Sequence, residues 1–180
     1  MKHTLFRYTS DTDKSYGVAG MAIAVLAYDA QDALASVTID TADGTTDALS
    51  FHPGFHYIPN QRMSAKTAWN EMIAQTQLLA GMLVANAMSR NYVQHRRRLS
   101  HTMTEALAPA LADTVDKDDT PLERDELDAM LRRNLDFFDR LFQISAVHTA
   151  THALADDLAK RRTLSPAEVL DHLAAIERYL

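Results

Sequence analysis

The sequence predicts a mostly helical protein with one small β-hairpin near its N-terminus and two long antiparallel helices accompanied by shorter ones. Three observations favour this fold class. Residues 64–98 contain no proline and one glycine, Gly81, and helix-favouring residues fill most positions. Residues 120–158 repeat apolar side chains at helical spacing. Residues 34–40 alternate and carry three β-branched residues in a row, as a half-buried strand does.

The first long helix, predicted over residues 64–98, would span about 50 Å at 1.5 Å per residue. A projection at about 100° per residue places Trp69 and Leu83 on one side and Leu78 and Met82 on nearly the opposite side. A helix that is apolar all round is normally covered on several sides, so it is expected to be the central helix of a bundle or part of an oligomer interface. Its least polar window, residues 73–88, contains four polar residues and falls short of the roughly 20 apolar residues of a membrane span.

The N-terminal third is predicted in three pieces. Residues 10–15 read as a turn or a mobile linker because Ser, Asp, Thr and Lys fill them. Residues 18–28 are rich in alanine and favour a buried helix, with a strand as the open alternative. Asp11 and Asp13 interrupt the basic region that a secretory signal needs, so no cleaved signal is expected. Residues 34–40 and 48–52 form the β-hairpin.

Start signals divide the second half of the chain. Thr102 and Glu105 have capping-box spacing and predict a short helix that is interrupted at Pro109. Thr120 and Ser165 are each followed by proline and, three residues on, by glutamate, which is typical of a helix N-terminus. The second long helix is therefore expected from Thr120 towards residue 158, and the last helix after Ser165.

The length of 180 residues favours one domain, in which residues 1–60 pack on a helical bundle of residues 61–180. The chain has no cysteine, which excludes disulfides and thiolate metal sites and is compatible with a cytoplasmic location. The formal net charge is -6. Residues 113–139 contain ten acids and four bases and so account for the whole imbalance.

Two basic triplets, residues 96–98 and 160–162, close predicted helices, where cationic side chains complement the helix macrodipole. A nucleic-acid-binding protein normally has a basic footprint, and this chain is acidic overall. The sequence therefore predicts no nucleic-acid partner and no membrane partner.

The candidate chemistry lies on the second long helix. If the helix is continuous, His148 and His152 fall within about 20° of the middle of its apolar face, together with Asn134. Two histidines four residues apart on a helix can grip one metal ion, and Asp156 extends the row by a turn. The predicted metal ligands are therefore His148, His152 and Asp156, and the predicted ligand-binding residues are His148, His152, Asn134 and Glu71, the last on the first long helix.

Two explanations of these histidines stay open. Each ring is either neutral and hydrogen-bonded to a backbone carbonyl or a polar neighbour such as Asn134 or Glu71, or part of a site for a divalent metal or a small ligand. Two functional hypotheses follow. The first is a non-enzymatic binding or assembly module that forms a homodimer or larger homo-oligomer or contacts a protein partner. The second is a metal- or small-ligand-binding helical bundle, with or without enzymatic activity.

Overall fold

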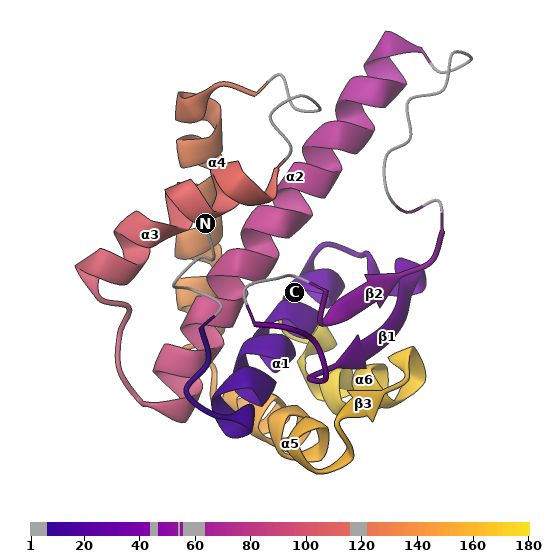
Figure 1. The fold of residues 1–180 in the computed structure, drawn as a ribbon, viewed down its shortest axis with the longest axis vertical. Coiled ribbons are helices and arrows are strands. Elements are labelled where there is room, and N and C mark those ends of the chain that lie inside the picture. The colour runs from indigo at the N-terminus through magenta and orange to yellow at the C-terminus, as the bar shows by residue number, and fades with distance from the viewer. Residues whose placement is uncertain (1–6, 44–46, 54, 56–63, 116–121) are drawn as a thin grey trace.

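The computed structural model describes residues 7–43, 47–53, 55, 64–115 and 122–180. Over these residues the fold is mostly helical, with six α-helices and a small three-stranded sheet, so the predicted fold class is confirmed. Figure 1 shows helix α2 crossing the molecule, with α3 and α4 on one side of it and the strands β1 and β2 on the other. In the part of the chain described, no helix is long and apolar enough to cross a membrane.

Helix α1, Asp11–Ala27, is the most completely buried element. Every residue from Asp13 to Val25 is buried, because α2 packs along one side of this helix and α5 along another. The predicted helix at residues 18–28 is thus confirmed. The predicted linker at residues 10–15 is wrong. Ser10 is the N-cap, and its hydroxyl accepts a hydrogen bond from the Asp13 amide at 3.1 Å, so the helix begins seven residues earlier than the apolar run.

The first predicted long helix comprises α2, Ala65–Met88, and a π-helical turn, η3, Ser89–Gln94. Burial divides α2 into two halves. Its C-terminal half, from Leu78 on, is almost entirely buried, as expected of a helix that is apolar all round. Its N-terminal half lies at the surface, and Trp69 is 45% exposed. The sequence predicts that this helix is central, and only its second half lies in the centre of the protein. Helix α1 lies there beside it.

The sheet joins the two ends of the chain. The predicted hairpin is confirmed as β1, Leu34–Thr38, and β2, Leu49–Phe51, which pair antiparallel. A short 3₁₀ helix, η2, Gln31–Ala33, precedes β1. The third strand, β3, Thr163–Leu164, pairs with the other edge of β1 and was not predicted. It forms where the chain turns after α5, at Arg162 with φ 68°, and the Ile39 amide donates to the Arg162 carbonyl at 2.8 Å.

Helix α3, His101–Thr114, is continuous, so the predicted interruption at Pro109 is wrong. Ser100 rather than Thr102 is its N-cap and accepts from the Met103 amide at 3.2 Å. Pro109 lies on the exposed side of the helix and removes one amide donor from it without ending it.

The second predicted long helix is two helices, α4, Arg124–Leu141, and α5, Ser145–Arg161. Helix α4 starts with a capping box between Glu123 and Glu126, three residues after the predicted cap, Thr120, which lies outside the described residues. A turn at Phe142, Gln143 and Ile144 then redirects the chain, with Phe142 completely buried. Because of this turn, α4 packs on α2 while α5 packs on α1.

The last helix, α6, Pro166–Leu173, begins as predicted, with Ser165 and Glu168 forming a capping box and Pro166 in the first turn. A 3₁₀ turn, η4, Ala174–Tyr179, follows it. Both pack back on α5, and Val169, Leu173 and Ile176 join the buried cluster that α1, α2, α4 and α5 also line. The described parts of the N-terminal segment and of the bundle thus contribute to one core.

Candidate functional site

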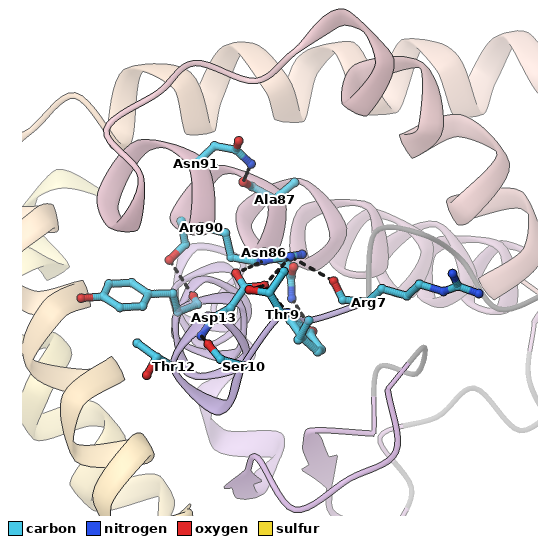
Figure 2. A network of polar contacts seen from close by, with 12 residues as sticks. Arg7, Thr9, Ser10, Thr12, Asp13, Asn86, Ala87, Arg90 and Asn91 are labelled. Carbon is cyan, nitrogen blue, oxygen red and sulfur yellow. Dashed lines mark hydrogen bonds and ion pairs between the residues drawn. The ribbon is translucent and has the colours of Figure 1, made fainter.

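A buried ion pair joins Asp13, at the start of α1, to Arg90 in η3, which directly follows α2 (Figure 2). Nε of Arg90 donates to Oδ1 of Asp13 at 2.7 Å, and a terminal nitrogen donates to Oδ2 at 2.8 Å. Asp13 is 1% exposed and Arg90 9%. Thr9 adds its amide to the same carboxylate at 2.9 Å, and Arg90 also donates to the Arg7 carbonyl at 3.1 Å. This fork-to-fork geometry fixes the direction of η3 as well as satisfying both charges.

Near this ion pair the main chains of α1 and α2 also lie close together. A Cβ on Gly20 would lie 2.3 Å from the Ala85 carbonyl oxygen and 2.7 Å from Cβ of Ser89, so α1 and α2 approach as closely as a glycine allows. The Ser89 hydroxyl donates to the Tyr16 carbonyl at 2.6 Å. Burial by itself would raise the pKa of Asp13, but the hydrogen bonds from Arg90 and Thr9 outweigh it and hold that pKa below its ordinary value.

The π-helical turn sets the direction in which the chain leaves α2. The turn ends at His95, and Arg96 adopts a left-handed conformation with φ 51°. The Arg97 amide returns to the Asn91 carbonyl at 2.8 Å, which closes the helix end. Arg96, Arg97 and Arg98 therefore follow the helix rather than forming its last turn. Single π-helical turns are frequent at functional sites, so the surface beside η3 is a candidate binding site.

A cavity of about 630 Å³ lies between these arginines and the start of α5. We call this cavity the arginine pocket. The wall opposite the arginines begins at the turn between α4 and α5. Its lining residues are Tyr92, Arg96, Arg97, Arg98, Gln143, Ser145, His148, Thr149 and His152.

The three arginines of the pocket are exposed, and none of them has an ion-pair partner among the described residues. The opposite wall is also electropositive. Helix α5 begins at Ser145 after Ile144, which supplies no side-chain cap, so the positive end of its macrodipole is not neutralised there. The pocket thus concentrates positive potential on a chain whose net charge is -6.

Each of the two pocket histidines uses one ring nitrogen for a protein contact. Nε2 of His148 lies 2.5 Å from the Phe142 carbonyl oxygen, and Nδ1 of His152 lies 2.5 Å from the Tyr16 hydroxyl. The Tyr16 and His152 rings meet edge to face, with centroids 5.4 Å apart. The carbonyl contact of His148 agrees with the structural explanation that the sequence left open. Both rings also line the pocket, so the two explanations are not exclusive.

One acid stands behind the pocket wall. Asp139 accepts a hydrogen bond from the Tyr92 hydroxyl on one oxygen and from Gln143 Nε2, at 2.9 Å, on the other. Burial and then this carboxylate raise the pKa of Tyr92 to about 12, so its hydroxyl keeps its proton. Each Asp139 oxygen thus accepts from a residue of the pocket lining, and no ion pair joins Asp139 to the three arginines among the described residues.

The structure separates the residues that the sequence placed in one site. His148 and His152 share the pocket, but Asn134 does not line it. Asn134 is buried between α4 and α2, where it accepts from the Tyr28 hydroxyl at 2.6 Å. Glu71 is exposed on the surface half of α2. The turn at residues 142–144 is the reason, because the projection that united Asn134 with the histidines assumed one continuous helix.

Asp156, the third predicted metal ligand, is exposed on α5 and is not part of the pocket lining. Its charge is nevertheless close enough to Tyr16 to add to the effect of burial, and both raise the pKa of that hydroxyl. Within the described ranges, no group of three or more His, Asp or Glu side chains is placed to hold a metal ion. Metal binding by His148, His152 and Asp156 stays a prediction without structural support.

Sequence reasoning missed the arginines as site residues and the Asp13–Arg90 pair that positions them. A signal for the start of α1 existed, because Ser10 followed three residues later by Asp13 has the spacing of a helix cap before an apolar run, but nothing in the sequence pointed to Arg90 as the partner of Asp13. The sequence analysis explained the three arginines by their favourable interaction with a helix C-terminus. No glycine or proline before them indicates that the helix ends at residue 94.

Comparisons of the chain with models of protein families, with curated proteins and with solved structures find no match. The geometry and charge of the pocket are therefore the features of this chain that point to a function.

Proposed function

We propose that this protein is a non-enzymatic binding module that takes a small anionic ligand, of the phosphate or carboxylate class, in the arginine pocket. The observation that carries the proposal is that three arginines without carboxylate partners among the described residues share one cavity with two histidines and an uncapped helix N-terminus. Guanidinium groups and helix N-termini are the groups that proteins use to bind oxyanions.

Charge favours an anion over the metal ion considered from the sequence. One unit charge about 7 Å from another in water gains or loses about 0.6 kcal/mol. Three arginines at that distance favour a monoanion by about 2 kcal/mol and disfavour a cation by the same amount. The two histidines could each offer a free ring nitrogen to a metal, but the cation would have to approach through this field.

The test is calorimetric titration of the protein with pyrophosphate at low ionic strength. The decisive variant is Arg97→Gln/Arg98→Gln, and its matched control is Arg132→Gln/Arg133→Gln, which removes two exposed neighbouring arginines from α4, outside the pocket. We expect the pocket variant to bind at least about 10-fold more weakly, since two of the three charge contributions are lost and pyrophosphate carries more than one negative charge, and the control to bind within about twofold of the parent.

Two outcomes would overturn the proposal. One is that the parent protein shows no saturable binding of pyrophosphate. The other is that both double variants lose affinity equally, which would mean that the anion responds to net charge rather than to the pocket. Raising the salt concentration should weaken binding to the parent protein, because the arginines are solvent-exposed.

The homo-oligomer predicted from the sequence remains a prediction, and it is compatible with ligand binding. The N-terminal half of α2 is the surface that favours it, because Trp69, the one tryptophan of the chain, is 45% exposed there. A second copy of the chain would cover this half-helix. Sedimentation at several protein concentrations, with Trp69→Ser beside the parent protein, would decide the question.

A further inference from the structure

The ring of His148 is held in one tautomer by the main chain. Its Nε2 lies 2.5 Å from the Phe142 carbonyl oxygen, and a carbonyl can accept a hydrogen bond but cannot donate one. Nε2 therefore carries the proton of the neutral ring. Nδ1 is then an unprotonated acceptor, and it has no hydrogen-bond partner among the described residues.

The carbonyl that fixes this tautomer is itself well held. Phe142 is completely buried, and its amide donates to the Phe138 carbonyl at 2.9 Å at the end of α4. The His148 amide also donates to the Ile144 carbonyl at 3.2 Å, so the backbone of the residue is anchored in the same turn. The acceptor character of Nδ1 consequently depends on rigid main chain instead of on a mobile side chain.

The other ionic groups of the pocket are donors. Arg96, Arg97 and Arg98 can only donate. Burial and then Asp156 raise the pKa of Tyr16, so its hydroxyl keeps its proton. That hydroxyl can donate to Nδ1 of His152 or accept from it, and in the tautomer where it donates, Nε2 of His152 carries the ring proton and is a donor. The hydroxyl and amide groups of the lining, on Tyr92, Gln143, Ser145 and Thr149, can accept as well as donate, and Nδ1 of His148 is the ring nitrogen that can only accept.

We infer that the pocket selects a protonated oxyanion, a monohydrogen phosphate or a phosphate monoester in its monoprotonated form, and that His148 is the residue that recognises the proton. This inference rests on the proposed anion-binding function. The arginines and His152 bind the unprotonated oxygens, and the P–O–H group donates to Nδ1 of His148. Sulfate and simple carboxylates lack that proton, so they would face Nδ1 with a lone pair and leave the acceptor unsatisfied.

Inorganic phosphate and sulfate are the probes that isolate this effect, because both are tetrahedral and both are dianions at slightly alkaline pH. Under that condition free imidazole is neutral, and phosphate still carries one proton. We expect the parent protein to bind phosphate at least about 10-fold more tightly than sulfate, because a sulfate oxygen would leave the half-buried Nδ1 without a donor. Equal affinities would overturn the inference while leaving the proposed function intact.

Two histidine variants give opposite expectations. His148→Ala removes the acceptor, so phosphate and sulfate should bind within about twofold of each other through the arginines. His152→Ala is the matched control from the same wall, four residues away, and removes a donor. It should weaken both anions in parallel and keep the ratio between them. A ratio that survives in His148→Ala would overturn the assignment to His148.

A measurement on the unmodified protein keeps the inference testable if His148→Ala fails to fold. Nitrogen NMR of ¹⁵N-labelled histidine rings reports which ring nitrogen carries the proton. We expect Nδ1 of His148 to be unprotonated in the free protein and to change its shift on adding phosphate but not on adding sulfate. A protonated Nδ1 in the neutral ring would overturn the inference, and if neither anion binds at all, the proposed function fails with it.

Discussion

Arg90 and the arginines of the pocket come from the same end of the same helical segment, six to eight residues apart, and the structure treats them in opposite ways. Arg90 is buried and meets the Asp13 carboxylate with two nitrogens, at 2.7 and 2.8 Å. Arg96, Arg97 and Arg98 are exposed and face a cavity with no carboxylate partner among the described residues. Whether an arginine stabilises the fold or is available to bind a ligand therefore depends on whether a carboxylate such as that of Asp13 lies beside it, and not on the residue type.

The two regions also differ in what they contribute to stability. A buried charge without its partner is costly, whereas an exposed arginine contributes little to folding and repels its neighbours. The Asp13–Arg90 pair holds η3 on α1 and so places the three arginines that follow it. The Asp13–Arg90 ion pair fixes this end of the helix, so the three exposed arginines need no carboxylate partner of their own to keep the chain in place.

The largest expected effect comes from opening the closed pair. Asp13→Ala would leave the buried Arg90 without its carboxylate and should lower the free energy of unfolding by about 3–5 kcal/mol. Arg97→Ala, the comparison variant from the pocket, should change it by no more than about 0.5 kcal/mol. Urea unfolding followed by circular dichroism measures both. A loss below about 1 kcal/mol in Asp13→Ala would show that the pair does not hold the fold.

A smaller effect is expected from separating the helices that carry the pair. Gly20→Ala places a Cβ 2.3 Å from the Ala85 carbonyl oxygen, so α2 must shift, at a cost of about 1–3 kcal/mol. Because η3 moves with α2, binding of pyrophosphate in the pocket should weaken as well. Gly17→Ala is the comparison on the same helix, since its Cβ would lie 2.7 Å from Nδ2 of Asn86 and 2.9 Å from Cε1 of Tyr8 and so would meet side chains instead of main chain. Equal losses in the two variants would argue against a main-chain contact.

A third test removes the charge of Asp13 and keeps a side chain of nearly the same shape, and its smallest effect is expected at low pH. Its pKa is lowered in the folded protein, so its ionised form contributes stability above the ordinary carboxyl pKa of about 3.9, and this contribution is lost as the pH falls through the lower folded value. Asp13→Asn lacks that contribution at every pH. The difference in unfolding free energy between parent and variant should therefore narrow on acidification below about pH 4, and a constant difference would contradict the assignment.

Much of the fold could be predicted from local pattern. The hairpin at β1 and β2, the buried alanine-rich helix and the start of α6 at Ser165 follow from alternation, composition and capping residues that act over a few positions. The early start of α1 also had a local signal, Ser10 with Asp13, but the polar composition of residues 10–15 favoured a turn. The polar residue Asp13 can lie in a buried helix because it forms an ion pair with Arg90, which is distant in the sequence.

The candidate site was less accessible to sequence reasoning. His148 and His152 could be found because their spacing places them on one helix face, and both line the pocket. Asn134 could not be excluded, because no glycine or proline marks the turn at residues 142–144. That turn exists because burying Phe142 and packing α5 on α1 outweigh the continuation of one helix.

The sequence by itself determined most of the helical segments, the capped start of α6 and which strands pair as a hairpin, since these depend on contacts a few residues apart. Only the tertiary structure decided that α1 is the buried helix, that one arginine of the helix end is neutralised while three are not, and that two histidines face those three. These features depend on residues more than 40 positions apart, such as Asp13 with Arg90 and Arg97 with His148. Local pattern has no information about such pairs, because it is the packing of whole helices that brings them together.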